Sequence, residues 1–289
     1  MDTRAALQQL GIGDLTDAQR RKLDDDGYFI IENAFSEDQR ARMAAEVDRM
    51  AGIEGDKAGS EVSIERGAVR ISNVFNKSTA FDCLLEIKPL VAAAAYLLGE
   101  MKIHGANVRE PQLGSGQQPL HADSIKRADG EWCLVNSLIL FDDMTLANGP
   151  TRVVPGSHKW APLNVPGENA ADYTTKPRDK PHQWAVKGDN VAEHSTESLA
   201  VGEAVREPED PFAPYPGEVL VTVPARAVVV TNAHIWHSGT ARQSNARRRM
   251  LHLSYTRRDM PQQLVQRRFV TPPLYERMNE AHRYLLDIA

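Results

Sequence analysis

The sequence predicts a mainly β fold with flanking helices, in which a β-sandwich or barrel follows an N-terminal helical block. Residues 1–99 contain segments with helical spacing and helix caps. After residue 101 the apolar segments become short, rich in β-branched residues, and separated by Gly, Pro and Asn. Short strands that follow a helical block are typical of a sandwich or barrel with helices packed outside.

In the N-terminal block, turn and cap residues mark the borders of the expected elements. Thr16 and Ser36 stand where helix N-caps are expected, Gly27 ends the first helix, and Gly99 stands where the last helix should close. The expected elements are a helix beginning at residue 17, a strand over 28–31, a helix over 37–50, a strand over 69–75 and a helix over 81–98.

The strands expected in the second half are residues 101–108, 134–141, 152–154, 218–223, 227–231 and 249–255, and a final helix is expected over 273–288. Residues 159–217 contain eight of the 17 prolines and little periodicity. A segment of this length without secondary structure is usually functional or disordered. We interpret it as an insertion that forms a lid over the substrate.

We expect residues 1–289 to form a single domain. It would consist of the helical block over 1–99, a β core over 100–258 that carries the insertion, and a C-terminal helical segment over 259–289.

Composition excludes several classes of protein. The chain has 289 residues, a net charge of −5 and no long basic run, so nucleic acid or an anionic membrane is not expected as its main partner. Two cysteines, Cys83 and Cys133, exclude a disulfide scaffold and suit the reducing cytoplasm. No apolar stretch is long enough to span a bilayer, and the first 25 residues contain no secretory apolar region.

Three short patterns contain residues suited to metal and anion chemistry. In His121-Ala122-Asp123 the first and third residues would face the same side of an extended strand, so an imidazole and a carboxylate could share one metal ion. The run of residues 234–239 contains two further histidines, His234 and His237. One of them would complete a set of two histidines and one carboxylate, the facial triad of non-haem iron(II) oxygenases.

The third pattern is the run Arg247-Arg248-Arg249, which precedes an alternating strand-like segment. A run of arginines is often a solvated surface. Here alternation would direct side chains of one parity inward, and a buried guanidinium needs an anion, which a 2-oxo diacid would supply.

Four stretches of the chain resemble the phytanoyl-CoA dioxygenase family of Fe(II)/2-oxoglutarate oxygenases. They are DDGYFII at residues 25–31 with Phe35-Ser36, QPLHAD at 118–123, NGPTRVVPGSH at 148–158, and His237-Ser238-Gly239 with Arg248 eleven residues after His237. The resemblance implies a double-stranded β-helix core, also called a jelly roll, of the cupin-like kind.

The resemblance also implies a site. The iron ligands would be His121, Asp123 and His237, with no catalytic residue beyond them. Arg248 would bind the distal carboxylate of 2-oxoglutarate, and Arg70 is a weaker candidate for that role.

Two further positions, Gln118 and Thr151, correspond to places where related enzymes contact the co-substrate.

The implied activity uses Fe(II), 2-oxoglutarate and O2 to hydroxylate or otherwise oxidise an unactivated C–H bond of a small organic substrate, with release of succinate and CO2. Secondary metabolism is one setting for such an enzyme, which would act as a monomer or homodimer. Related halogenases have a small residue in place of the carboxylate, so Asp123 favours oxygenation.

The sequence departs from the family pattern in two places. Thr240-Ala241-Arg242 stands where Gly-Pro-Asn is usual, and His237 follows His121 after 116 positions, a longer gap than usual. Two other functions stay open: a cupin-like metalloprotein with non-oxidative chemistry, and a non-catalytic binding protein on the same fold.

Overall fold

A computed structural model of the chain describes residues 1–124, 130–165, 191–192 and 205–289. Within those ranges, none of the helices combines the length and the apolar character that crossing a bilayer requires. The α-helices described are α1 (Thr3–Gln9), α2 (Asp17–Asp25), α3 (Glu37–Glu54), α4 (Val74–Lys77), α5 (Lys88–Leu98), α7 (Pro272–Arg277) and α8 (Glu280–Leu286). Short 3-10 helices are η1 (Gly55–Lys57), η2 (Thr79–Glu86), η3 (Ser157–Lys159) and η4 (Gln266–Arg268).

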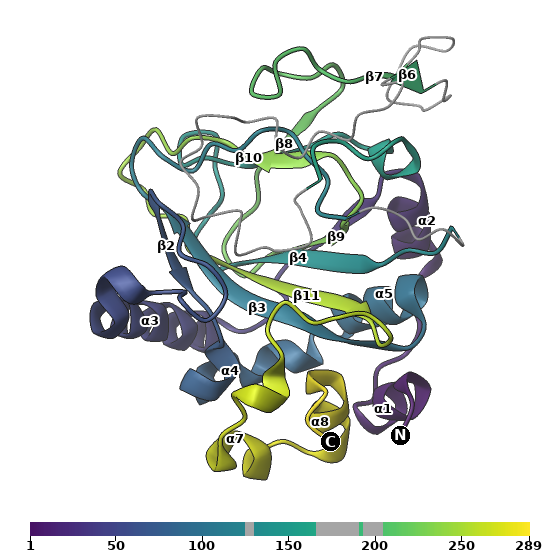
Figure 1. Cartoon of the computed structure of the whole chain (residues 1–289), viewed down its shortest axis with the longest axis vertical. Coiled ribbons are helices and arrows are strands. Elements are labelled where there is room, and N and C mark those ends of the chain that lie inside the picture. The colour runs from purple at the N-terminus through teal and green to yellow at the C-terminus, as the bar shows by residue number, and fades with distance from the viewer. Residues whose placement is uncertain (125–129, 166–190, 193–204) are drawn as a thin grey trace.

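Two antiparallel sheets face each other. The larger has the order β1-β9-β4-β11-β3-β2, and the smaller has the order β10-β5-β8, above it in Figure 1. The larger sheet comprises β1 (Tyr28–Ile31), β2 (Ala68–Ile71), β3 (Met101–Pro111), β4 (Leu134–Leu140), β9 (Val228–Asn232) and β11 (Met250–Arg257). The smaller comprises β5 (Thr151–Val153), β8 (Val219–Val221) and β10 (His237–Gly239). A separate pair is formed by β6 (Val191–Ala192) and β7 (Val205–Arg206).

The larger sheet is buried on both faces. Alternation along each strand determines which side chains face the helices and which face the smaller sheet. On β4, Val135 and Ile139 face the helices, and they belong to the main apolar core. Leu138 and Leu140 face the other sheet and pack in a second cluster between the sheets. The helices α3, α4, α5 and α8 cover the lower face in Figure 1, so the space between the sheets is the place left for a site.

The predicted caps are confirmed. Thr16 accepts a hydrogen bond from the backbone N–H of Gln19, whose side chain accepts one in return from the backbone of Thr16. Ser36 and Gln39 make the same reciprocal pair at the start of α3. Each box satisfies two N–H groups that lack partners inside the helix.

Three predicted elements are wrong in extent. The helix expected over 81–98 is divided into η2 and α5 at Ile87, because Pro89 fits the first turn of a helix and not its interior. The final helix is divided at Met278, which is extended, and Asn279 caps the second part. The strand over 69–75 ends at Ile71 and is followed by α4.

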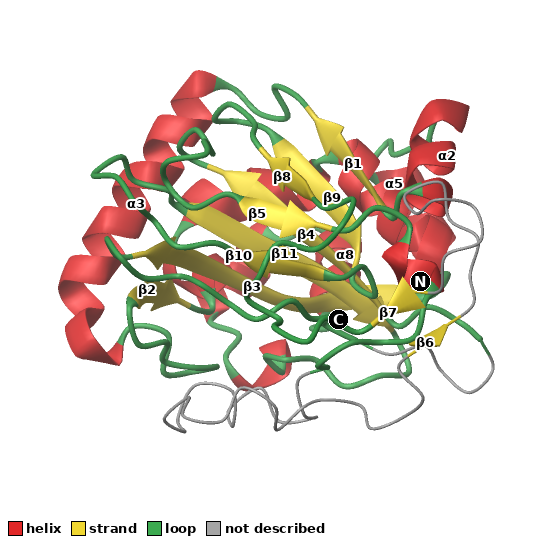
Figure 2. Ribbon diagram, turned by 90° about the horizontal axis from the view of Figure 1, so that it is seen from above, coloured by secondary structure: helices red, strands yellow, loops and turns green. Residues whose placement is uncertain are grey.

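The insertion over 159–217 can be described only at its two ends. Residues 166–190 and 193–204, on which the predicted lid depends, lie outside the described residues. At the described ends, Trp160 and Tyr215 pack on Trp236, with ring centroids 5.0 Å and 5.5 Å away from that indole. These rings belong to one apolar cluster with Leu120 and Val154, so both described ends of the segment pack against the same part of the fold. Figure 2 shows the strands of the smaller sheet in front of those of the larger sheet.

Candidate metal centre

The two predicted histidine ligands meet across a short antiparallel bridge. The N–H of His121 donates to the carbonyl of His237 at 3.0 Å, and the N–H of His237 donates to the carbonyl of His121 at 2.8 Å. The backbone N–H of Asp123 donates to the carbonyl of Ala233 at 2.9 Å. Backbone pairing therefore fixes His121 and Asp123 beside the segment of His237, which is far away in the sequence.

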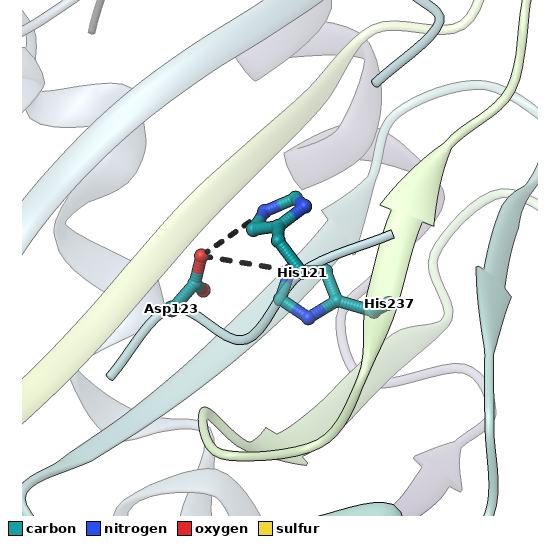
Figure 3. A group of neighbouring side chains, drawn as sticks. All are labelled: His121, Asp123 and His237. Atoms are coloured by element: carbon teal, nitrogen blue, oxygen red, sulfur yellow. Dashed lines mark ion pairs between the residues drawn. The ribbon is translucent and has the colours of Figure 1, made fainter. Parts of the chain in front are cut away.

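The three side chains converge on one point (Figure 3). Their potential ligand atoms all lie within 4.8 Å of one another. The Oδ1 atom of Asp123 lies 3.5 Å from the Nε2 atom of His121 and 3.5 Å from that of His237. The structure thus brings together the three residues predicted as ligands, His121, Asp123 and His237.

Both imidazole rings present the correct nitrogen. The Nδ1 atom of His121 lies 2.7 Å from the carbonyl oxygen of Pro119, and that of His237 lies 2.9 Å from the carbonyl oxygen of Ile235. A carbonyl can only accept, so each Nδ1 carries the proton and each Nε2 keeps its lone pair. This is the usual way in which a protein fixes the tautomer of a metal-binding histidine.

The protonation states of the three side chains also suit the binding of a cation. Burial opposes ionisation of Asp123, but the two histidines and Asn136 outweigh it and hold the pKa of this carboxyl below its usual range. The Nδ2 atom of Asn136 donates to Oδ2 of Asp123 at 3.0 Å, which leaves Oδ1 to face the histidines. Burial lowers the pKa of His237, so that ring is neutral at pH 7.

The donor set fits Fe(II). Two imidazole nitrogens and one carboxylate oxygen are the protein ligands of the facial triad, which leaves further positions of an octahedral ion open. A structural zinc site uses four protein ligands. Among the described residues, the group that could hold a metal consists of these three residues.

We predict that Asn136→Ala weakens metal binding by roughly 10- to 100-fold, the usual effect of losing a partner that orients a ligand. Calorimetric titration with Mn(II) in place of oxygen-sensitive Fe(II) measures the change. The matched control is Thr231→Val, because the hydroxyl of Thr231 donates to the backbone oxygen of Asn136 and not to the carboxylate. Equal metal affinity in Asn136→Ala and the wild type would contradict this orienting role.

The second part of the site is Arg248, whose side chain is fully buried. Its Nη1 atom lies 3.4 Å from the sulfur of Met250, a weak acceptor, whereas Nε and Nη2 have no hydrogen-bond partner among the described residues. Burial, and then the positive charge of Arg109, lower the pKa of this guanidinium to about 9. A bound anion would stabilise this buried cation and accept hydrogen bonds from its two donor nitrogens that lack partners.

Arg70, the weaker candidate for this role, already has a carboxylate partner. It donates to Glu65 at 3.0 Å, and Arg109 donates to the same carboxylate at 2.6 Å. The two neighbours of Arg248 in the triplet are ion-paired on the opposite side of the strand. The prediction that one arginine of the triplet turns inward therefore agrees with the structure, and that residue is Arg248.

The two weaker candidates lie beside the histidine strand. The Oε1 atom of Gln118 accepts from the backbone N–H of Gly239 at 3.2 Å. Thr151 pairs with Gly239 across the strands, and alternation places it on the same face as Val153, which packs between the sheets. Both are near the metal-bearing strand, and their contact with a co-substrate stays a prediction.

The competing histidine lies outside the ligand group. His234 packs its ring against Trp132 with centroids 4.9 Å apart, and its Nε2 atom lies 3.4 Å from the backbone N–H of Cys133. The Nε2 atom of His158 lies 3.1 Å from the carbonyl oxygen of Asp24, which joins the 148–158 motif to α2.

Sequence reasoning missed several polar residues on the inner face of the larger sheet. Asn136 alternates with the apolar residues of β4, and this pattern could have placed it inside. Asn107 and His252 face each other on neighbouring strands β3 and β11, where only the register decides their position. These residues line the space between the sheets together with Arg248.

Comparisons with known proteins identify relatives of this chain. A family model described as phytanoyl-CoA dioxygenase (PhyH) matches residues 23–250. The chain is 28% identical over 200 residues to the iron/alpha-ketoglutarate-dependent dioxygenase ausO of Aspergillus calidoustus, covering 64% of this chain and 66% of that protein. It is 27% identical over 176 residues to an ectoine dioxygenase of Bordetella parapertussis, covering 56% of this chain and 57% of that protein. The matches thus span less than two thirds of these relatives.

Solved structures share the fold. HygX from Streptomyces hygroscopicus, crystallised with nickel and 2-oxoglutarate, aligns with a TM-score of 0.58 at 16% identity and covers 86% of this chain and 90% of HygX. The alpha-ketoglutarate-dependent carbocyclase SnoK from nogalamycin biosynthesis aligns with a TM-score of 0.56 at 17% identity and covers 94% of each chain. With the two facing sheets, these likenesses confirm the predicted double-stranded β-helix core.

Proposed function

This chain belongs to the phytanoyl-CoA dioxygenase family, and from that premise we propose that it is an Fe(II)/2-oxoglutarate-dependent dioxygenase. Its reaction is the hydroxylation or a related oxidation of an unactivated C–H bond in a small organic molecule. The main support is one observation: a cluster of two histidines and one carboxylate shares the interior of the fold with the buried guanidinium of Arg248, whose Nε and Nη2 atoms have no partner among the described residues.

Different residues would bind the metal and the co-substrate. His121, Asp123 and His237 would hold Fe(II), which when bound supplies the activation of O2 coupled to decarboxylation of 2-oxoglutarate to succinate and CO2. Arg248 binds the distal carboxylate of 2-oxoglutarate with its planar fork and so orients the co-substrate. Gln118 and Thr151 would contact the same molecule from the histidine side.

Asp123 also bears on the type of oxidation. A halogenating relative needs an open position where this carboxylate stands. In this chain the carboxylate is present, faces both histidines and is held by Asn136. Oxygenation rather than halogenation is therefore the proposed outcome.

The interior lining supports a substrate with a hydrogen-bonding group. Asn107 is 3% exposed, and its Oδ1 atom has no partner among the described residues. Opposite it, burial lowers the pKa of His252 to about 3, so this ring is neutral and offers one donor and one acceptor. Secondary metabolism is the proposed setting, since SnoK belongs to nogalamycin biosynthesis. Soaking crystals that contain Ni(II) and 2-oxoglutarate with a metabolite collection tests this lining.

The activity is tested by measuring succinate formed from 2-oxoglutarate in air with Fe(II) and ascorbate. We expect succinate even without the true substrate, because uncoupled turnover is common in this chemistry, and we expect none when Fe(II) is omitted. Metal binding without 2-oxoglutarate binding would instead indicate a cupin-like metalloprotein. Binding of both without turnover, in the presence of candidate substrates, would indicate a binding protein.

We further propose that the protein acts in the cytoplasm as a monomer or homodimer. Neither cysteine forms a disulfide in the part of the chain that the structure describes, as a reducing compartment allows. Light scattering on the purified protein determines the oligomeric state, and a mass of a trimer or above would contradict this proposal.

A further inference from the structure

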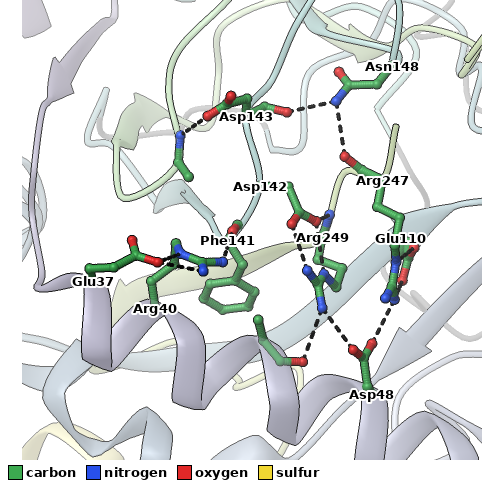
Figure 4. A network of polar contacts seen from close by, with 12 residues as sticks. Glu37, Arg40, Asp48, Glu110, Phe141, Asp142, Asp143, Asn148, Arg247 and Arg249 are labelled. Carbon is green, nitrogen blue, oxygen red and sulfur yellow. Dashed lines mark hydrogen bonds and ion pairs between the residues drawn. The ribbon is translucent and has the colours of Figure 1, made fainter. Parts of the chain in front are cut away.

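The two neighbours of Arg248 are held on the outside of the fold. Successive residues of an extended segment point to opposite sides, so Arg247 and Arg249 face outward when Arg248 faces inward. Figure 4 shows both outward side chains meeting carboxylates between α3 and the larger sheet. Different carboxylates hold the residues before and after Arg248: Glu110 contacts Arg247, and Asp142 contacts Arg249.

Asp142 holds Arg249 by both main chain and side chain. Its Oδ2 atom accepts from the backbone N–H of Arg249 at 2.8 Å and from Nε at 2.9 Å, and its Oδ1 atom accepts from Nη2 at 2.7 Å. The carbonyl of Arg249 accepts from the backbone N–H of Phe141 at 3.0 Å. The residue after Arg248 is therefore fixed to the end of β4.

Glu110 holds Arg247 in a two-point fork, in which Nε and Nη2 donate to its two oxygens at 2.6 Å each. The carbonyl of Arg247 accepts from Nδ2 of Asn148 at 3.1 Å, and the same amide donates to the carbonyl of Asp143 at 2.7 Å. The residue before Arg248 is thus fixed as well, and the contact gives a role to the asparagine of the 148–158 motif.

Helix α3 closes the arrangement from outside. Asp48 accepts from Arg247 at 2.7 Å through Oδ1 and from Arg249 at 3.0 Å through Oδ2, so one carboxylate spans both neighbours of Arg248. One turn earlier, the carbonyl of Ala44 accepts from Arg249 at 3.3 Å. One further turn toward the N-terminus of α3, Arg40 donates to the carbonyl of Phe141 at 3.0 Å.

We infer that Asp142, Glu110 and Asp48 form a clamp that positions Arg248 for 2-oxoglutarate. Arg248 forms no ion pair within the part of the chain that the structure describes, so its own contacts there do not compensate the cost of burying its charge. The clamp does so indirectly, because turning Arg248 outward would require both ion-paired neighbours to leave their carboxylates. The inference rests on the proposed function, in which Arg248 binds the co-substrate.

The main test is Asp142→Asn in the whole protein loaded with Mn(II) under nitrogen. An amide offers one accepting oxygen in place of two and no charge, so the hold on Arg249 weakens. We expect the dissociation constant of 2-oxoglutarate, measured by calorimetry, to rise roughly ten-fold. Metal affinity should stay within about two-fold of wild type, and under turnover KM for 2-oxoglutarate should rise while kcat is largely kept.

A matched ion pair elsewhere separates positioning from loss of stability. Asp82 accepts from Nε of Arg277 at 2.7 Å and from Nη2 at 3.2 Å, and its side-chain exposure, 27%, is similar to the 18% of Asp142. Asp82→Asn should therefore lower Tm about as much as Asp142→Asn does, with 2-oxoglutarate binding unchanged. The more exposed Asp48→Asn, with 46% exposure, provides a second clamp variant with a smaller expected weakening.

The outcomes separate the clamp from the proposed function. If the wild type fails to bind 2-oxoglutarate, the proposed function is wrong and the clamp fails with it. If the wild type binds and either clamp variant binds more weakly than Asp82→Asn, the clamp is supported. If both clamp variants bind 2-oxoglutarate as tightly as Asp82→Asn does, the clamp is overturned.

Discussion

His237→Ala is expected to abolish both tight metal binding and 2-oxoglutarate turnover, and so are His121→Ala and Asp123→Ala. Each replacement leaves a facial set with two ligands, and the loss should exceed the roughly 10- to 100-fold that removing an outer-shell partner costs. The two histidines stand alike relative to the carboxylate, since Oδ1 of Asp123 lies 3.5 Å from both imidazole Nε2 atoms. Calorimetric Mn(II) binding and succinate formation measure the two effects separately.

The matched control for these variants is His234→Ala. It removes a buried histidine that lies three residues before His237 and is not one of the three clustered residues. Because His234 packs on Trp132 and not on the ligand cluster, this variant should lose some stability and keep metal binding. An inactive His234→Ala enzyme beside an active His237→Ala enzyme would show that the ligand assignment is wrong.

Substitution of Arg248 should separate stability from function. Arg248→Lys keeps the charge but loses the planar fork, so KM for 2-oxoglutarate should rise roughly ten-fold or more, about 1.4 kcal/mol. Arg248→Met should abolish 2-oxoglutarate binding while it stabilises the ligand-free protein by about 1–3 kcal/mol, because it removes a buried charge whose donors are unsatisfied. A gain in stability with a loss of function is typical of a binding residue.

Thermal unfolding with and without 2-oxoglutarate measures this separation, with Arg247→Met as the control. Arg247 donates to two carboxylates, so its replacement should lower the Tm of the ligand-free protein instead of raising it. Added 2-oxoglutarate should raise the Tm of metal-loaded wild type but not that of Arg248→Met. A destabilised ligand-free Arg248→Met protein would mean that the guanidinium already has an adequate partner in the fold.

Much of the fold and the site could be predicted because local chemistry determined it. Thr16 and Ser36 begin helices because their hydroxyls accept from the third N–H of the helix, a signal contained within four residues. The three residues that the structure brings together could be predicted from the resemblance, since HxD and the distal histidine stand in recognisable motifs. The family and the β-helix core are confirmed by the comparisons.

The parts that were missed depend on tertiary contacts. The strand β10 is three residues long, and it exists because it pairs with β5 on one side and with His121 on the other. Asn136 donates to the predicted metal ligand Asp123 from a strand whose sequence shows only that the residue is inward. The clamp around Arg248 joins α3, β3 and β4, and no local pattern predicts which of three consecutive arginines lacks an ion pair.

A crystal structure of protein crystallised without oxygen, with Fe(II) and 2-oxoglutarate, tests most directly whether one iron and one 2-oxoglutarate molecule share the interior of this fold. We predict a metal ion bound by Nε2 of His121, Nε2 of His237 and a carboxylate oxygen of Asp123. We also predict the distal carboxylate of 2-oxoglutarate on the guanidinium of Arg248. A metal bound elsewhere, or 2-oxoglutarate bound away from Arg248, would contradict these predictions.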